Sequence, residues 1–145
     1  MAEQKETTVE KKETVKKTEA IVRGESIRLS MKVASYINSF IKNKKIDDAL
    51  NQLEEVLKMK RAIPYKGEIP HRKGDMMSGR YPQSGSKIYV TLLKTLRGNA
   101  VVNGLNLDKT TIYYASSGWA QRPPKAGRAK GKRANVIIKC RENTK

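Results

Sequence analysis

The sequence is poor in the residues that catalytic, metal and disulfide sites use. Its 145 residues include one cysteine and one histidine, so an intrachain disulfide is excluded and a Cys/His metal cluster lacks ligands. It contains no Walker-type phosphate loop and no Ser/His/Asp set. Cys140 alternates with Val136 and Ile138, which predicts a small buried side chain rather than a nucleophile. We therefore expect no enzymatic activity, no cofactor, no metal and no small-molecule substrate.

Long hydrophobic runs are also missing. No apolar stretch approaches the roughly 20 residues that cross a bilayer, and residues 1–19 alternate Lys, Glu and Thr without the apolar centre of a signal peptide. These absences favour an intracellular protein in a reducing compartment, with no membrane partner. Residues 1–19 have too few large apolar side chains to fold and are predicted to be a disordered N-terminal tail; ordering on a partner is the alternative.

Positive charge is what the chain has in excess. Lys and Arg number 31 against 14 Asp and Glu, a formal net charge of +17. Residues 58–82 carry +5 and residues 118–145 carry +8, whereas residues 1–57 together carry only +1. Charge concentrated in two segments indicates contact with a polyanion, because charge that served only solubility would be spread evenly.

Hydrophobic spacing predicts one α+β domain over residues 20–145. We expect a small three-stranded antiparallel sheet packed on three helices, with a long protruding basic β-hairpin over residues 110–141. Ser30 is expected to cap the first helix, and Gly24 marks a bulge in the first strand. The predicted strands are residues 20–29, 107–117 and 134–141. The first predicted helix follows Ser30, and the second spans residues 46–59. The third begins within residues 82–86 and reaches at least Arg97, with Gly104 as the alternative end.

The outer part of the predicted hairpin is the leading candidate for function. Residues 118–133 hold six cations, no acid and no aliphatic side chain larger than Ala, so they cannot build a core. Residues 120–133 would project roughly 20–25 Å, at ~3.3 Å per residue. Cations facing several directions suit a finger enclosed by nucleic acid. The RNA-binding residues predicted here are Arg122, Lys125, Arg128, Lys130, Lys132 and Arg133, with Trp119 either stacking on a base or packing across the stem.

A second candidate surface is the segment from Arg61 to Tyr81. It shows no helical or strand period, and a loop of about 20 residues in a compact domain is usually functional or disordered. Basic residues alternate there with aromatics and glycines, which favours a loop docked on RNA over a floppy surface loop. The predicted contacts are Lys60, Arg61, Tyr65, Lys66, His71, Arg72, Lys73, Arg80 and Tyr81, together with Lys32 in the first helix.

Several segments, in this order along the chain, resemble a known family. The segments are Ile27–Lys32, Lys44–Ala49, Met59–Tyr65, His71–Gly74, Gly79–Pro82 and the basic hairpin. Over about residues 20–143, the chain is similar to the archaeal and eukaryotic branch of the universal large-subunit ribosomal protein family twenty-two, called seventeen in eukaryotic ribosomes.

This resemblance implies a structural rRNA-binding protein of the cytoplasmic ribosome that supports assembly and translation. In that family the globular part sits near the exit of the peptide tunnel, and the hairpin threads through rRNA and lines the tunnel. The implied partners are large-subunit rRNA, neighbouring large-subunit proteins and, at the hairpin tip, the nascent peptide.

Two other functions also fit a basic arm. An architectural DNA-binding protein could embrace a duplex with basic β-arms and wedge Pro123 or Pro124 at a base step. A module that binds an acidic protein would use the same charge, but nucleic acid would not co-purify with it.

Overall fold

The computed structural model describes residues 18–69 and 71–143. The predicted tail lies outside these residues, except that Glu19 already pairs with Arg141 in the first strand. The elements, in chain order, are β1 (Glu19–Ile27), α1 (Met31–Ile41), α2 (Ile46–Leu57), β2 (Ile63–Pro64), β3 (Gly79–Arg80), α3 (Gln83–Val102), the 3₁₀ turn η1 (Leu107–Lys109), β4 (Thr110–Trp119) and β5 (Ala134–Glu142).

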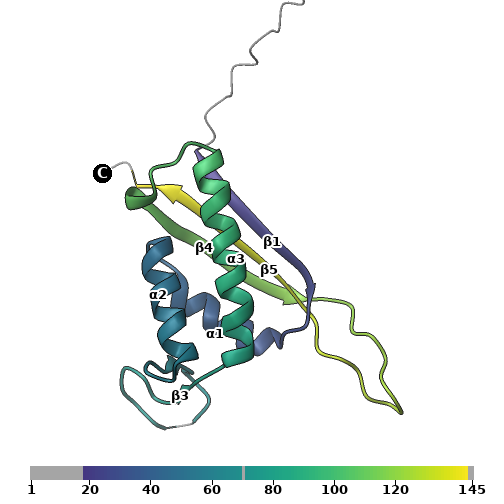
Figure 1. Ribbon diagram of the computed structural model, residues 1–145. Helices are drawn as coiled ribbons and strands as arrows, with labels where there is room; N and C mark the ends of the chain where they lie inside the picture. Colours follow the sequence, from purple (N-terminus) through teal and green to yellow (C-terminus); the bar gives the residue numbers. More distant parts are fainter. Residues whose placement is uncertain (1–17, 70, 144–145) are drawn as a thin grey trace, which may run out of the picture.

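The sheet has the strand order β1-β5-β4, with both pairs antiparallel. Along the central strand β5, the side chains of Val136, Ile138 and Cys140 are buried, whereas those of Ile137 and Lys139 are only half-buried. Figure 1 shows the reason: α1, α2 and α3 all lie on one side of the sheet. The predicted α+β class, with three helices on a three-stranded antiparallel sheet, is confirmed.

The first strand contains the expected irregularity. Its pairing with β5 shifts between Gly24 and Ile27, and Ser26 within the shift has a φ of 48°, in the left-handed region that non-glycine residues rarely adopt. The predicted cap of α1 is only half right. Ser30 occupies the N-cap position in extended conformation, but its side chain makes no capping hydrogen bond.

The helices bury the faces that their spacing predicts, with local shifts. In α2 the buried residues are Ile46, Ala49, Leu53 and Val56, and the helix ends at Leu57, two residues before the predicted end at Met59. The helix α3 continues through Gly98 to Val102, which confirms the longer of the two predicted extents. Its buried residues are Gly85, Ser86, Tyr89, Leu93, Leu96 and Ala100, whereas Ile88 and Leu92 are only half-buried.

Two asparagines at the C-terminal end of α3, Asn99 within the helix and the C-cap residue Asn103, attach the helix to the edge strand β1. Asn99 Nδ2 donates to the Ile21 carbonyl at 2.9 Å, and Asn103 Nδ2 donates to the Glu19 carbonyl at 2.9 Å. These bonds satisfy carbonyls along a sheet edge where the described residues place no further strand.

Two sequence expectations about irregular segments need correction. Residues 61–81 were expected to be without strands, but Ile63–Pro64 and Gly79–Arg80 pair as a two-stranded ribbon. The strand predicted from Leu107 begins only at Thr110, because Asn106 accepts from the Asp108 N–H and starts the 3₁₀ turn.

Candidate nucleic-acid interface

The first candidate surface is the basic loop, defined here as residues 120–133, which joins β4 to β5. The strand ladder ends at the pair Trp119 and Ala134, and beyond it the chain projects past the sheet and the helices (Figure 1). Residues 121–130 are all exposed. Only the isolated bridge between Pro124 and Lys130 continues the strand pairing, so the predicted arm is a hairpin loop rather than a continuous two-stranded ribbon.

Backbone hydrogen bonds give the basic loop a defined path. The Lys125 N–H donates to the Ala129 carbonyl and the Gly131 N–H to the Pro123 carbonyl, both at 2.9 Å. At the tip, Gly127 has a φ of 66°, a conformation that glycine adopts without strain. The turn at residues 125–129 therefore has a defined backbone path, and it carries Lys125 and Arg128 in exposed positions.

The cations of the basic loop have no acidic partner among the residues that the structure describes. The ion pairs found there use Arg61, Arg80 and Arg97, which lie in other parts of the chain. Six positive charges close together repel each other, and a polyanion that surrounds them removes this cost.

Trp119 is where the basic loop leaves the sheet. Its side chain is 58% exposed, and the guanidinium carbon of Arg122 lies 4.3 Å from the centre of its ring. Of the two alternatives left open by the sequence, burial across the stem is therefore not observed. A guanidinium plane over an indole offers a flat surface on which a base can stack.

The root of the basic loop is fixed to the bulge of β1. Arg133 Nη1 donates to the Ser26 carbonyl at 2.9 Å, and the Ser26 N–H donates to Asn135 Oδ1 at 2.8 Å. The Ser26 backbone, with its positive φ, thus hydrogen-bonds to both Arg133 and Asn135 where the basic loop meets β5. Arg133, predicted only as an RNA contact, already has this structural role.

A basic hollow lies beside this root. It has a volume of about 330 Å³ and is lined by Arg28, Ser30, Lys125, Lys130 and Lys132. Arg28 is not predicted from the sequence, because it lies about 100 residues from the cations that it joins. Four cations around one hollow match the chemistry of a phosphate group.

The second candidate surface comprises residues 60–81. Lys60, Lys66, Arg72 and Lys73 are exposed, as is His71 with a φ of 62°. Figure 1 shows this segment at the end of the molecule below α1 and α2, toward which the basic loop also extends. No hydrogen bond or ion pair found in the described part of the chain joins the two surfaces.

Tyr65 lies in the core rather than on this surface. It is 3% exposed, and its ring stacks on Tyr36 with 4.0 Å between centroids. Its predicted role as a stacking platform for RNA is therefore not supported, and we leave it out of the interface. Tyr81 is 45% exposed and remains a candidate.

The arginines of this segment have acidic neighbours, in contrast to those of the basic loop. Arg61 Nη1 lies 3.5 Å from Glu55 Oε2, and Arg80 Nη2 lies 2.8 Å from Glu68 Oε2. Both pairs have an exposed arginine, and such pairs add little to stability. They do lower the charge that this surface offers to a polyanion.

The remaining candidate lies apart from these surfaces. Lys32 is exposed in the first turn of α1.

Other kinds of functional site find no support in residues 18–69 and 71–143. Cys140 is fully buried, and burial raises the pKa of its thiol to about 11, so it lacks the thiolate that a nucleophile needs. Among the described residues, no cluster of His, Cys, Asp and Glu could hold a metal ion. None of the helices described is long and apolar enough to cross a membrane.

The sequence is similar to those of known proteins. The chain is 37% identical over 99 residues to the large ribosomal subunit protein uL22 of Archaeoglobus fulgidus, which covers 65% of this chain and 64% of that protein. It is 33% identical over 138 residues to uL22 of Methanoregula boonei, covering 84% and 90%. It is 31% identical over 126 residues to uL22 of Methanothrix thermoacetophila, covering 79% and 82%.

A sequence model of one protein family matches almost the whole described structure. The match covers residues 22–141, from the second half of β1 to the end of β5, and it includes both candidate surfaces. The chain belongs to the ribosomal protein L22p/L17e family.

Proposed function

We propose that this chain binds large-subunit rRNA, with the basic loop enclosed by the RNA and residues 60–81 as a second contact. Membership of the family makes it a non-enzymatic structural protein of the large subunit of the cytoplasmic ribosome. The observation that carries the proposal is the basic loop itself, which is exposed over residues 121–130 and has no core and no acid of its own.

The proposed RNA contacts combine charge and stacking. The cations are Lys32, Lys60, Arg61, Lys66, Arg72, Lys73, Arg80, Arg122, Lys125, Arg128, Lys130, Lys132 and Arg133, with Arg28 added by the structure. Trp119, Tyr81 and His71 supply flat rings. Many phosphate contacts give affinity, and the folded shape of the RNA gives specificity.

We also propose a location for the tip of the basic loop. By the family resemblance of the hairpin, residues 125–129 line the tunnel through which the nascent peptide leaves, and the body lies near the exit beside neighbouring large-subunit proteins. The small side chains at Ala126, Gly127 and Ala129 fit a wall that must leave space for a passing peptide.

A loop replacement tests the RNA-binding proposal. Ala120 and Arg133 face each other, with the Ala120 N–H donating to the Arg133 carbonyl at 3.4 Å. Replacing residues 121–132 by Asn-Gly would therefore close the hairpin with a two-residue turn. The variant should keep its melting temperature, because the removed segment contributes little to the core. In binding to large-subunit rRNA, log K falls as log salt rises. Loss of up to five phosphate contacts should make this slope shallower by about 3.5–4.5.

A matched control separates charge from length. Changing Arg122, Lys125, Arg128, Lys130 and Lys132 to Gln keeps the loop and should lower the slope by a similar amount. Wild-type slopes in either variant would overturn the proposal. If duplex DNA competes as well as rRNA for the wild-type protein at equal salt, the architectural DNA function replaces it.

A further inference from the structure

A second hollow lies on the outer side of α1, away from the basic loop. Its volume is about 570 Å³, within the range of small-ligand sites. The outward side of α1, its C-terminal connection and the β2 segment all contribute to the wall. Its lining includes two aromatic rings, one serine and three lysines: Tyr36, Ser39, Phe40, Lys42, Lys44 and Lys66. We call it the α1 hollow.

The aromatic side of the α1 hollow is held in place. The ring of Tyr36 stacks on the buried Tyr65, with 29° between the ring planes, and its hydroxyl donates to the Lys66 carbonyl at 3.3 Å. Tyr36 therefore joins α1 to the segment that follows β2. A ring fixed at its back and at its hydroxyl forms a rigid wall for a flat ligand.

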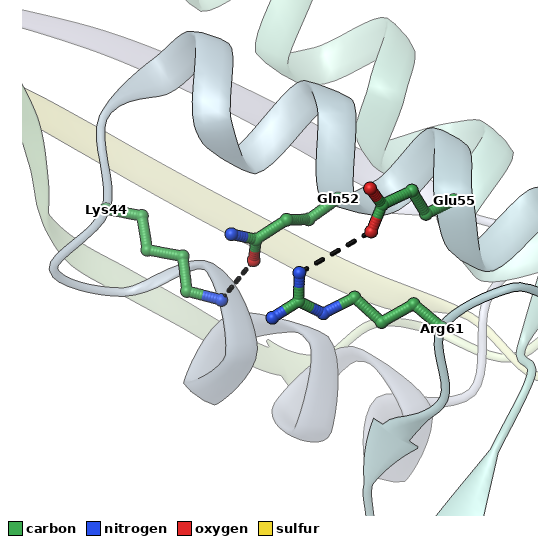
Figure 2. Close-up of polar contacts among 4 residues, drawn as sticks. All are labelled: Lys44, Gln52, Glu55 and Arg61. Atoms are coloured by element: carbon green, nitrogen blue, oxygen red, sulfur yellow. Dashed lines mark hydrogen bonds and ion pairs between the residues drawn. The ribbon is translucent and has the colours of Figure 1, made fainter.

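The charged side of the hollow is crowded with cations. Lys44 Nζ lies 3.7 Å from the centre of the Phe40 ring and donates to Gln52 Oε1, while the Arg61 guanidinium lies 5.7 Å from the same ring. Figure 2 shows Lys44 and Arg61 approaching each other from opposite sides, with Lys44 directed at Gln52 and Arg61 at Glu55.

This crowding carries an electrostatic cost. Burial and then the like charge of Arg61 lower the pKa of Lys44, against a smaller opposing effect of Asp48. Glu55 faces Arg61, and no acidic residue of the part of the chain that the structure describes lines the hollow. Because Lys42, Lys44 and Lys66 line it, an anion placed there would be attracted to these lysines and would favour the charged form of Lys44.

We propose that the α1 hollow binds one unpaired RNA nucleotide, with the base against Tyr36 and Phe40 and the phosphate on Lys42 and Lys66. This inference rests on the proposed rRNA binding; the site is separate from the basic loop and shares Lys66 with the surface formed by residues 60–81. Base stacking on aromatic rings is independent of sequence because every base has a π face. An acidic peptide would use the lysines but leave the fixed aromatic wall without a partner.

A paired substitution measures the phosphate contact. Lys42→Gln with Lys66→Gln removes two exposed charges while leaving the packed rings in place. In binding to large-subunit rRNA, the salt slope should fall by about 0.7, as expected for one contact to a single strand, at unchanged melting temperature. Lys58→Gln with Lys94→Gln, two exposed lysines outside the hollow, should leave the slope unchanged. Equal slopes in both double variants would overturn the inference.

Ultraviolet cross-linking of intact large subunits gives the second readout. Trypsin releases residues 33–42 as one peptide that contains Tyr36 and Phe40, and we expect this peptide to carry a nucleotide adduct. Adducts on basic-loop peptides alone would overturn the α1 site and leave the proposed function standing. The absence of adducts from both would contradict the proposed function. A protein carboxylate coupled to Lys42 or Lys66 by a zero-length reagent would show that a peptide occupies the hollow instead.

Discussion

The body of the protein, which is the three-stranded sheet with its three helices, and the basic loop are held in shape by different forces. In the body, side chains such as Ile37, Leu53, Leu93 and Ile138 are fully buried, and burial of apolar surface drives folding. In the basic loop, residues 121–130 are exposed, and a few backbone hydrogen bonds and one anchored arginine set the path. Stability and RNA affinity therefore reside in different parts of one chain, so substitutions should alter them separately.

Residues 60–81 lie between these extremes. They carry exposed cations like the basic loop, but Ile63 and Tyr65 are buried in the core, and the β2–β3 ribbon pairs their two ends. A change in this segment should therefore affect both stability and binding, depending on which side chain is altered.

The largest expected effect is a cavity in the body. Leu93 in α3 is fully buried, so Leu93→Ala should lower the free energy of unfolding by about 2–5 kcal/mol. Its neighbour Lys94 is exposed, and Lys94→Ala should change it by no more than about 0.5 kcal/mol. Urea unfolding followed by circular dichroism measures both. Equal midpoints for the two variants would contradict the assignment of α3 as a core helix.

A smaller effect is expected from a buried hydrogen bond. Tyr89 is fully buried, and its hydroxyl donates to Asn38 Oδ1 at 2.7 Å. Tyr89→Phe leaves the buried Asn38 amide without this donor and should cost about 1–3 kcal/mol. Tyr36→Phe, which removes the more exposed bond to the Lys66 carbonyl, should cost less in the same unfolding experiment. A larger loss for Tyr36→Phe would contradict this ranking.

The sequence predicts the parts of the fold that depend on local spacing. Helix α1 follows from apolar residues three and four apart, and Ile37 and Ile41 are indeed fully buried. The alternation of side chains in β5 likewise predicts a strand with one buried face, and Val136 and Ile138 are buried. The concentration of charge in residues 120–133 is likewise a property of neighbouring residues, so the amino-acid pattern is enough to predict an exposed basic loop.

What the sequence could not predict depends on distant contacts. Tyr65 was assigned to RNA because its neighbours are basic, but the ring that covers it, Tyr36, comes from another element 29 residues earlier in the chain. Arg28 joins the basic hollow only because the root of the hairpin folds beside the end of β1. At Ser30, the preference of serine for the N-cap position predicts the start of α1 correctly. The capping hydrogen bond that it also predicts is not formed.

The smallest effects provide the sharpest separation of body from loop, because one type of substitution can be made in both. Arg128→Gln in the basic loop should leave the free energy of unfolding within about 0.5 kcal/mol of wild type and lower the salt slope of rRNA binding by about 0.7–0.9. Arg97→Gln in α3 breaks the pair with Asp47 at 3.2 Å and should cost about 0.2–1 kcal/mol with no change in slope. Unfolding and salt-titrated binding should thus give opposite patterns for the two variants. If Arg128→Gln destabilised the fold, the basic loop would have to contribute to the body, and the two regions could not be treated as independent.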